Sequence, residues 1–186
     1  MKTAGNTGVS DAALLALHRD LVATPSVSGD EGRIARRVEA WLGAHLPRVE
    51  RRGDNVLGWV GDAGPIFCLC SHMDTVPPAR DWTHDPWTPR VVEGRVIGLG
   101  ANDAKASVAA MMAAAARIAS SARLPGARLL VLLVAQEETG GEGAEVIVPA
   151  LRAEGLTPAA AVIGESTDLQ IAIAQKGQIE AELRTT

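Results

Sequence analysis

Apolar residues recur at helical spacing in two stretches near the start of the chain. Residues 11–22 place their leucines and a valine along one face behind Ser10, a residue type that favours the N-cap of a helix. Residues 34–46 repeat this pattern after the start signal Ser28-Gly29-Asp30-Glu31 and end before Pro47. The sequence therefore predicts two amphipathic helices in succession.

Continuous apolar runs further along the chain predict β-strands. Four such runs fall in residues 56–60, 66–70, 127–135 and 158–163. The last two are almost purely apolar, which is typical of strands that are covered on both faces. Residues 91–97 have the pattern of a small hairpin that turns at Glu93-Gly94. Alternation in residues 169–174 and 178–183 predicts a more exposed pair of strands.

Two further helices complete the pattern. An alanine-rich helix is expected in residues 104–119 and another in residues 142–153, where Pro149 could kink the helix or mark its first turn. Strands that alternate with helices predict an α/β fold, with a mostly parallel sheet and helices on both faces. Such sheets bind their ligands beyond the carboxyl ends of the strands, so the functional site is expected there.

Composition narrows the possible classes of function. A chain of 186 residues fits one domain, or one domain and a fragment of another. Its net charge of -4 provides no basic surface for a phosphate backbone or an anionic membrane. Four tryptophans and one phenylalanine offer little material for stacking on bases. Neither nucleic acid nor a membrane is therefore an expected partner.

The N-terminus and the cysteines bear on the location of the protein. Residues 1–10 lack the apolar core of a secretory signal, and no apolar run is long enough to span a bilayer. Cys68 and Cys70 stand two apart in one predicted strand, so their side chains run parallel and favour free thiols over a disulfide. A Cys-x-Cys metal or redox pair is the alternative interpretation. We expect a cytoplasmic protein with reduced cysteines.

Polar side chains directly follow three of the predicted strands. These side chains are His72 and Asp74 after the second strand, Glu137 and Glu138 after the third, and Glu165 after the fourth. A further carboxylate, Asp103, lies at the start of the predicted alanine-rich helix. Because the carboxyl ends of parallel strands meet at one edge of a sheet, we expect all six side chains to gather there.

An imidazole and several carboxylates, without thiolates, suit a divalent cation such as zinc, cobalt or manganese. His72 is the most specific ligand candidate, although a lone histidine can equally be a capping or core residue. Asp74 is placed to fix the tautomer of His72, which favours the ligand interpretation. Asp103, taken alone, could serve only as a helix N-cap.

The consecutive carboxylates Glu137 and Glu138 are harder to explain without a cation. Two carboxylates at the end of an apolar strand repel each other unless a positive charge neutralises one of them. A solvated loop remains the alternative. If one of the two binds a metal, the other is free to accept a proton from water, a division of roles that hydrolysis requires.

These residues resemble a known family of metallopeptidases. The matching segments are His72-x-Asp74-Thr75-Val76-Pro77, Gly98-Leu99-Gly100-Ala101-Asn102-Asp103-Ala104-Lys105, Glu137-Glu138-Thr139-Gly140, Gly164-Glu165-Ser166-Thr167 and Gln175-Lys176-Gly177. The family includes acetylornithine deacetylase, succinyl-diaminopimelate desuccinylase, aminoacylase-1 and carboxypeptidase G. Each segment is weak evidence alone, but five in the same order and spacing are specific.

The resemblance implies a catalytic site with two zinc ions. His72 and Glu165 would bind one ion and Glu138 the other, with Asp103 bridging both. Glu137 would be the general base, and Asp74 would support His72. The implied reaction is attack of water on the amide of an N-acyl amino acid, a small-molecule substrate. Where many members have Asp-Met-Lys-Gly-Gly, this chain has Asp103-Ala104-Lys105-Ala106-Ser107, which favours an acetylornithine deacetylase-like substrate; succinyl-diaminopimelate and peptides are the alternatives.

The resemblance also predicts the domain organisation. Residues 1–176 would form the N-terminal part of the catalytic domain, and residues 177–186 a strand that leads toward a lid domain beyond Thr186. Family members dimerise through that lid, so a homodimer is possible for a longer form. The family's last histidine ligand has no counterpart here, because His18 and His45 are expected on helix surfaces and His84 in a loop. The rival interpretation is a non-catalytic remnant that binds one metal at His72, Asp103 and Glu165.

Overall fold

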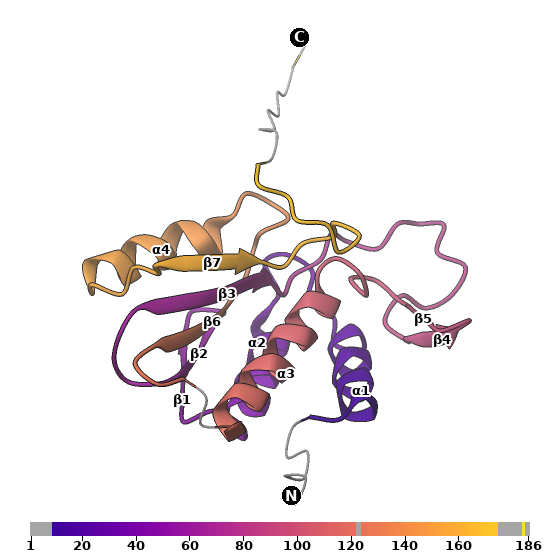
Figure 1. Ribbon diagram of the computed structural model, residues 1–186. Coiled ribbons are helices and arrows are strands. Elements are labelled where there is room, and N and C mark those ends of the chain that lie inside the picture. The colour runs from indigo at the N-terminus through magenta and orange to yellow at the C-terminus, as the bar shows by residue number, and fades with distance from the viewer. Residues whose placement is uncertain (1–8, 122–123, 175–183, 185–186) are drawn as a thin grey trace, which may run out of the picture.

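A five-stranded sheet with helices on both faces forms the centre of the computed structural model, which describes residues 9–121, 124–174 and 184 (Figure 1). The elements in chain order are α1 (Asp11–Val22), α2 (Gly32–Gly43), β1 (Arg48–Arg52), β2 (Asn55–Val60), β3 (Ile66–His72), β4 (Arg90–Val92), β5 (Arg95–Ile97), α3 (Lys105–Ser121), β6 (Arg128–Val134), α4 (Glu142–Ala153) and β7 (Ala160–Ile163). The predicted hairpin is confirmed as β4 and β5, with Val91 opposite Val96.

The strands of the main sheet lie in the order β1-β2-β6-β3-β7. β3 pairs in parallel with both β6 and β7, whereas β2 pairs antiparallel with β1 and with β6. Only β2 therefore runs against the other four strands, and the predicted mostly parallel α/β fold is confirmed. The carboxyl ends of β3, β6 and β7 consequently lie at the same edge of the sheet.

β6 forms the middle of the hydrophobic core. Leu129, Val131 and Leu133 point to the face that α1, α2 and α3 cover. Leu130 and Leu132 point to the opposite face, where Ile147 and Leu151 of α4 pack against them. Because both faces of β6 are buried, its sequence is apolar at every position after Arg128, and the predicted strand with two covered faces is confirmed.

Three strand predictions differ from the structure. The predicted buried strand at residues 158–163 is the edge strand β7, whose four residues are all exposed. β1 was not predicted, because its sequence Arg-Val-Glu-Arg-Arg is mostly charged and has no apolar pattern of a strand. Its pairing with β2 stabilises it. Residues 169–174 form no strand, although they were expected to, and the predicted strand at 178–183 lies outside the described residues.

The remaining expectations concern the helices and the cysteines. α4 contains Pro149 within its length, and α3 extends to Ser121. Cys68 is buried and Cys70 half-buried, and both are free thiols, as predicted. Within the described part of the chain, none of the helices combines the length and apolar character that a membrane span needs.

Candidate metal centre

The predicted site residues are carried by the carboxyl ends of three neighbouring strands. His72 is the last residue of β3, Glu137 and Glu138 follow β6, and Glu165 follows β7. Asp103 lies in the loop just before α3, and the ends of β3 and β7 point toward the start of that helix (Figure 1).

Three of these side chains converge on one point. The Nε2 atom of His72 lies 3.0 Å from Oδ1 of Asp103 and 3.9 Å from Oε2 of Glu165. One ligand atom from each residue lies within 4.8 Å of the others, and the two carboxylates are exposed while His72 is buried. One nitrogen and two oxygen donors open to solvent on one side fit a zinc ion that keeps a free position for water or substrate. We call these three residues the His72 cluster.

Asp74 lies directly behind the His72 cluster. Its carboxylate is fully buried and accepts hydrogen bonds from the Ser28 hydroxyl (2.7 Å) and from the amides of Glu137 (3.1 Å) and Glu138 (3.0 Å). Its Oδ1 atom lies 3.4 Å from Nδ1 of His72. A single carboxylate thus contacts the imidazole and fixes the backbone that carries both glutamates.

The protonation of this pair follows from these contacts. Burial alone would raise the pKa of Asp74, but hydrogen bonds from His72, Ser28 and the two amides outweigh it and lower that pKa to about 2. Burial alone would lower the pKa of His72, but its bonds to Asp74 and Asp103 raise that pKa to about 9. The metal-free imidazole is therefore protonated at neutral pH, and a cation at Nε2 would replace a proton.

Glu138 and Glu165 both have raised pKa values, as expected from burial and from the other carboxylates that lie close to them. Burial, and then the charge of Asp103, raises the pKa of Glu138. Burial also raises the pKa of Glu165; the charge of His72 opposes that rise and the charge of Asp103 adds to it. A divalent cation at this position would relieve the repulsion. Within the described residues Glu138 is not part of the His72 cluster. Its role as the ligand of a second metal therefore stays a prediction.

Three polar residues around the site, two of them buried and one half-buried, were not identified from the sequence. His18, expected on a helix surface, is half-buried, and its Nε2 atom lies 2.7 Å from the carbonyl oxygen of Ala101. Glu31, read only as a helix start signal, is fully buried, and its Oε1 atom accepts the amide of Gln136 at 2.9 Å. Both contacts join segments far apart in the chain, so local patterns carry no signal for them.

Lys105 is the third such residue. Its side chain is fully buried, its Nζ atom donates to the carbonyl of Thr24 at 2.9 Å, and the same atom lies 5.2 Å from the centre of the Trp87 ring. Burial lowers the pKa of this lysine to about 7, although the charge of Asp74 opposes that effect. Its place two residues after Asp103 was the only hint in the sequence. His45 and His84 are exposed, as expected.

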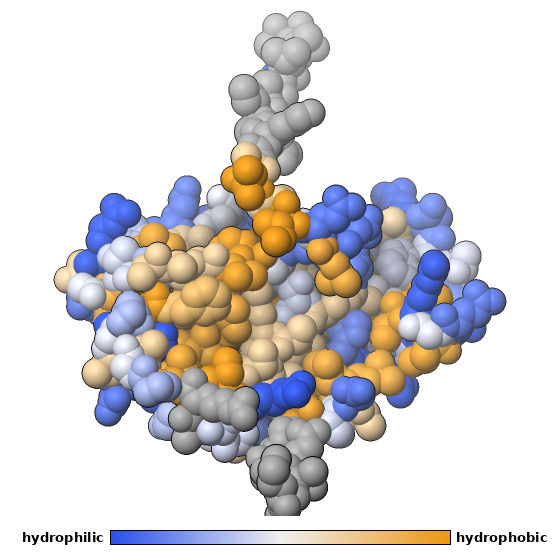
Figure 2. Space-filling view, viewed as in Figure 1, coloured by the Kyte–Doolittle hydropathy of each residue, from blue (hydrophilic) through white to orange (hydrophobic). Residues whose placement is uncertain are grey.

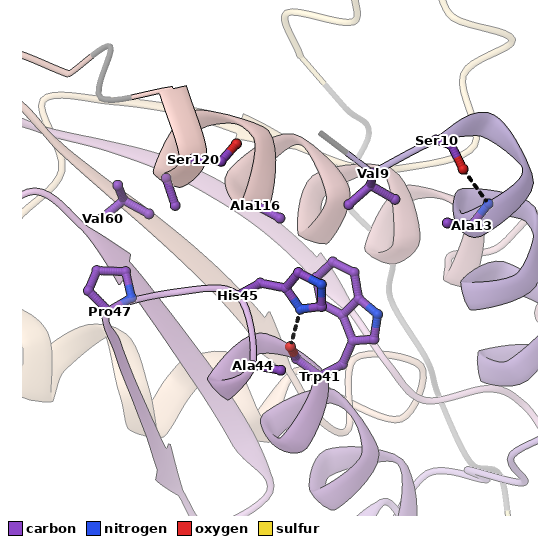
Figure 3. Close-up of a pocket in the computed structure, with 11 residues that line it drawn as sticks. Val9, Ser10, Ala13, Trp41, Ala44, His45, Pro47, Val60, Ala116 and Ser120 are labelled. Carbon is purple, nitrogen blue, oxygen red and sulfur yellow. Dashed lines mark hydrogen bonds between the residues drawn. The ribbon is translucent and has the colours of Figure 1, made fainter. Parts of the chain in front are cut away.

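An open pocket of about 700 Å³ lies elsewhere, between the start of α1 and the ends of α2 and α3 (Figure 3). The ring of His45 stacks on Trp41 at a centroid distance of 3.9 Å and lines this pocket. Val60, which also lines it, pairs with Leu129 at the beginning of β6. The pocket therefore lies near the amino end of β6, whereas the His72 cluster lies at the carboxyl ends of the strands.

An α/β domain that gathers an imidazole and carboxylates at its strand ends presents ligand types that divalent cations use in proteins. In the comparison with protein families, the sequence model of Peptidase family M20/M25/M40 matches residues 68–183. The chain belongs to this family.

Individual relatives carry several enzyme names. The chain is 34% identical to the succinyl-diaminopimelate desuccinylase of Phenylobacterium zucineum, over 90% of this chain and 47% of that enzyme. It is 35% identical to the acetylornithine deacetylase of Proteus mirabilis, over 91% of this chain and 46% of that enzyme. The chain thus spans about half the length of the curated relatives it matches.

A solved structure with a similar fold is a Bacillus subtilis protein described as a dinuclear metal binding peptidase of the M20 family. Its TM-score is 0.61 and its sequence identity 17%, over 78% of this chain and 41% of that one. At this identity the likeness supports the fold.

Proposed function

We propose that the protein acts, as part of a two-metal amide hydrolase, on the amide bond of an N-acyl amino acid. The observation that carries this proposal is the convergence of His72, Asp103 and Glu165 within 4.8 Å at the carboxyl edge of the sheet. Membership of a hydrolase family and the neighbouring glutamates after β6 support it.

In this proposal each site residue has a separate role. His72 and Glu165 would hold one divalent cation and Glu138 a second, with Asp103 available to both. Such ions, zinc or alternatively cobalt or manganese, would polarise the amide carbonyl and lower the pKa of a water molecule. Glu137 accepts the proton from that water and passes it to the leaving amine. Asp74 orients the His72 ring and holds the amides of both glutamates.

For the substrate we propose an N-acetylated amino acid of the acetylornithine type. The sequence Asp103-Ala104-Lys105 and the similarity to the Proteus mirabilis deacetylase support this choice. Succinyl-diaminopimelate is the competing substrate because of the Phenylobacterium zucineum relative. Comparing the hydrolysis of N-acetylornithine, N-succinyl-diaminopimelate and a dipeptide by the full enzyme would decide between them. A cytoplasmic location, supported by the two free thiols, is part of the same proposal.

Zinc titration of the metal-free protein tests the metal site. Uptake should collapse in the His72→Ala and Asp103→Ala variants, whereas Glu137→Ala should retain its zinc and lose turnover. Unchanged uptake in the first two variants would contradict the proposal.

A second candidate function has one observation in its favour. Within the described residues only three ligands converge, which is the set expected for a non-catalytic domain that binds a single metal. The stoichiometry of the same titration, measured with a hydrolysis assay on the complete gene product, separates the two candidates. Two equivalents of zinc with hydrolysis support the enzyme, and one equivalent without hydrolysis supports the single-metal domain.

A further inference from the structure

Two exposed side chains join the loops that carry Asp103 and Glu165. The Asn102 amide Nδ2 donates to the Ser166 hydroxyl at 3.1 Å, and that hydroxyl lies 3.4 Å from the Asn102 carbonyl oxygen. Asn102 directly precedes one carboxylate of the His72 cluster, and Ser166 directly follows the other. We propose that this Asn102–Ser166 clasp positions the two carboxylates for the metal. The inference rests on the metal site of the proposed function.

The loop that carries Glu165 is held in place at Gly164. The Gly164 amide donates to the carbonyl of Cys70 at 2.8 Å, and its own carbonyl accepts the Ser71 hydroxyl at 2.8 Å. A Cβ atom added at Gly164 would lie 2.7 Å from Cβ of Ser107 and 2.8 Å from Cε of Met111. The backbone just before Glu165 is therefore packed tightly between β3 and α3.

The loop that carries Asp103 is held in place by separate contacts. His18 contacts the carbonyl of Ala101, and the backbone amide of Lys105 donates to the carbonyl of Gly100 at 3.1 Å. The Lys105 side chain ties the same segment to Thr24. The two loops are thus attached to different parts of the fold. The clasp joins one loop to the other at the residues next to the carboxylates.

The carboxylates themselves need such a link. The side chain of Asp103 is 55% exposed and that of Glu165 is 39% exposed, so packing alone does not hold either one. Both carboxylates approach the same Nε2 atom of His72, at 3.0 Å and 3.9 Å, and two carboxylates held this close repel each other unless a cation lies between them. The Gln170 amide bonds to Thr167 within the same loop and so does not tie it to the rest of the domain. The clasp opposes the separation that repulsion favours.

A double-mutant cycle on zinc affinity tests the clasp. Asn102→Ala, Ser166→Ala and the double variant would each be titrated with zinc against a competing chelator. A single hydrogen bond outside the metal shell predicts that each single variant binds zinc about three- to tenfold more weakly. The double variant should bind no more weakly than Ser166→Ala, because removing the hydroxyl already loses the amide–hydroxyl bond and the hydroxyl's contact with the Asn102 carbonyl. Ser166→Thr, which keeps the hydroxyl, should bind zinc as tightly as the unsubstituted protein.

Two controls separate positioning from folding and from the proposed function. Both side chains are exposed, so the melting temperature of the metal-free variants should match that of the unsubstituted protein. The visible spectrum of bound cobalt should change in the single variants and be restored in Ser166→Thr. Single variants with unchanged affinity, or losses that simply add in the double variant, would overturn the clasp alone. An unsubstituted protein that binds no zinc would overturn the proposed function together with it.

Discussion

The Asp74 carboxylate connects three parts of the site that are distant in sequence. It contacts His72 two residues away, but Ser28 lies 46 residues before it and the two glutamate amides lie 63 and 64 residues after it. Sequence spacing predicted the first contact because it is local. The others depend on how the strand ends meet, which no local pattern specifies.

Replacing Asp74 with asparagine should weaken the site more than its small change in shape suggests. The amide retains one acceptor oxygen, but its NH₂ group would face a hydrogen-bond donor and leave a buried group unpaired. We expect a loss of about 1–3 kcal/mol in the free energy of unfolding and roughly 10- to 100-fold in zinc affinity. Urea unfolding and zinc titration would measure both. Asp62→Asn, at an exposed position, should change neither, and equal behaviour of the two variants would refute the role of Asp74.

The same pair predicts how the stability of the metal-free protein depends on pH. The pKa of His72 is raised from 6.5 to about 9, so its contribution is complete below pH 6.5 and is lost as pH rises through 9. The pKa of Asp74 is lowered from 3.8 to about 2, so its contribution is complete above pH 3.8 and is lost as pH falls through 2. The melting temperature should therefore fall between pH 6.5 and 9, and less so in Asp74→Asn. The same slope in both proteins would contradict the pairing.

At the scale of the elements, α4 is held to the sheet by a small set of apolar side chains. Ile147 is 1% exposed and packs with Leu151 against β6, whereas its neighbour Val146 is 71% exposed. Ile147→Ala should leave a cavity and lower the free energy of unfolding by about 2–5 kcal/mol. Val146→Ala on the same helix should stay within about 0.5 kcal/mol. Urea unfolding would test this, and similar losses in both variants would show that α4 does not pack as described.

Amphipathic or continuous apolar elements could be predicted from the sequence, because burial imposes those patterns. The two N-terminal helices, β6 and α4 fall in this class. β1 was not predicted, and β7 was predicted as a strand but not as an exposed one, because an edge strand takes its character from its single partner and not from its own composition. Five of the six predicted site residues follow an apolar run and Asp103 begins a predicted helix, so local patterns pointed to them, and the structure brings His72, Asp103 and Glu165 together. His18, Glu31 and Lys105 required the tertiary structure.

On the scale of the whole molecule, apolar side chains gather at the free edge of the sheet. Val162 and Ile163 of β7 are 48% and 59% exposed, and Phe67 of the neighbouring strand β3, opposite Ala160, is 41% exposed. Figure 2 shows this surface extending over β7 and into the segment that follows it. An exposed strand edge with apolar side chains favours pairing with another chain.

The 186-residue chain should therefore self-associate as its concentration rises. Val162→Lys places a charge on the edge strand and should shift the distribution toward monomer. Val146→Lys, at an exposed position on α4, is the matched control and should not. Sedimentation velocity over a range of protein concentrations would measure this. A chain that remains monomeric throughout, or one that responds equally to both substitutions, would contradict a role for the β7 edge.

We propose that His72, Asp103 and Glu165 gather around a divalent cation. Anomalous X-ray diffraction at the zinc edge, on crystals grown with zinc, would locate that ion. A peak is expected about 2.0–2.2 Å from Nε2 of His72 and from a carboxylate oxygen of Asp103 and of Glu165. A peak bound to other residues, or none near this cluster, would contradict it.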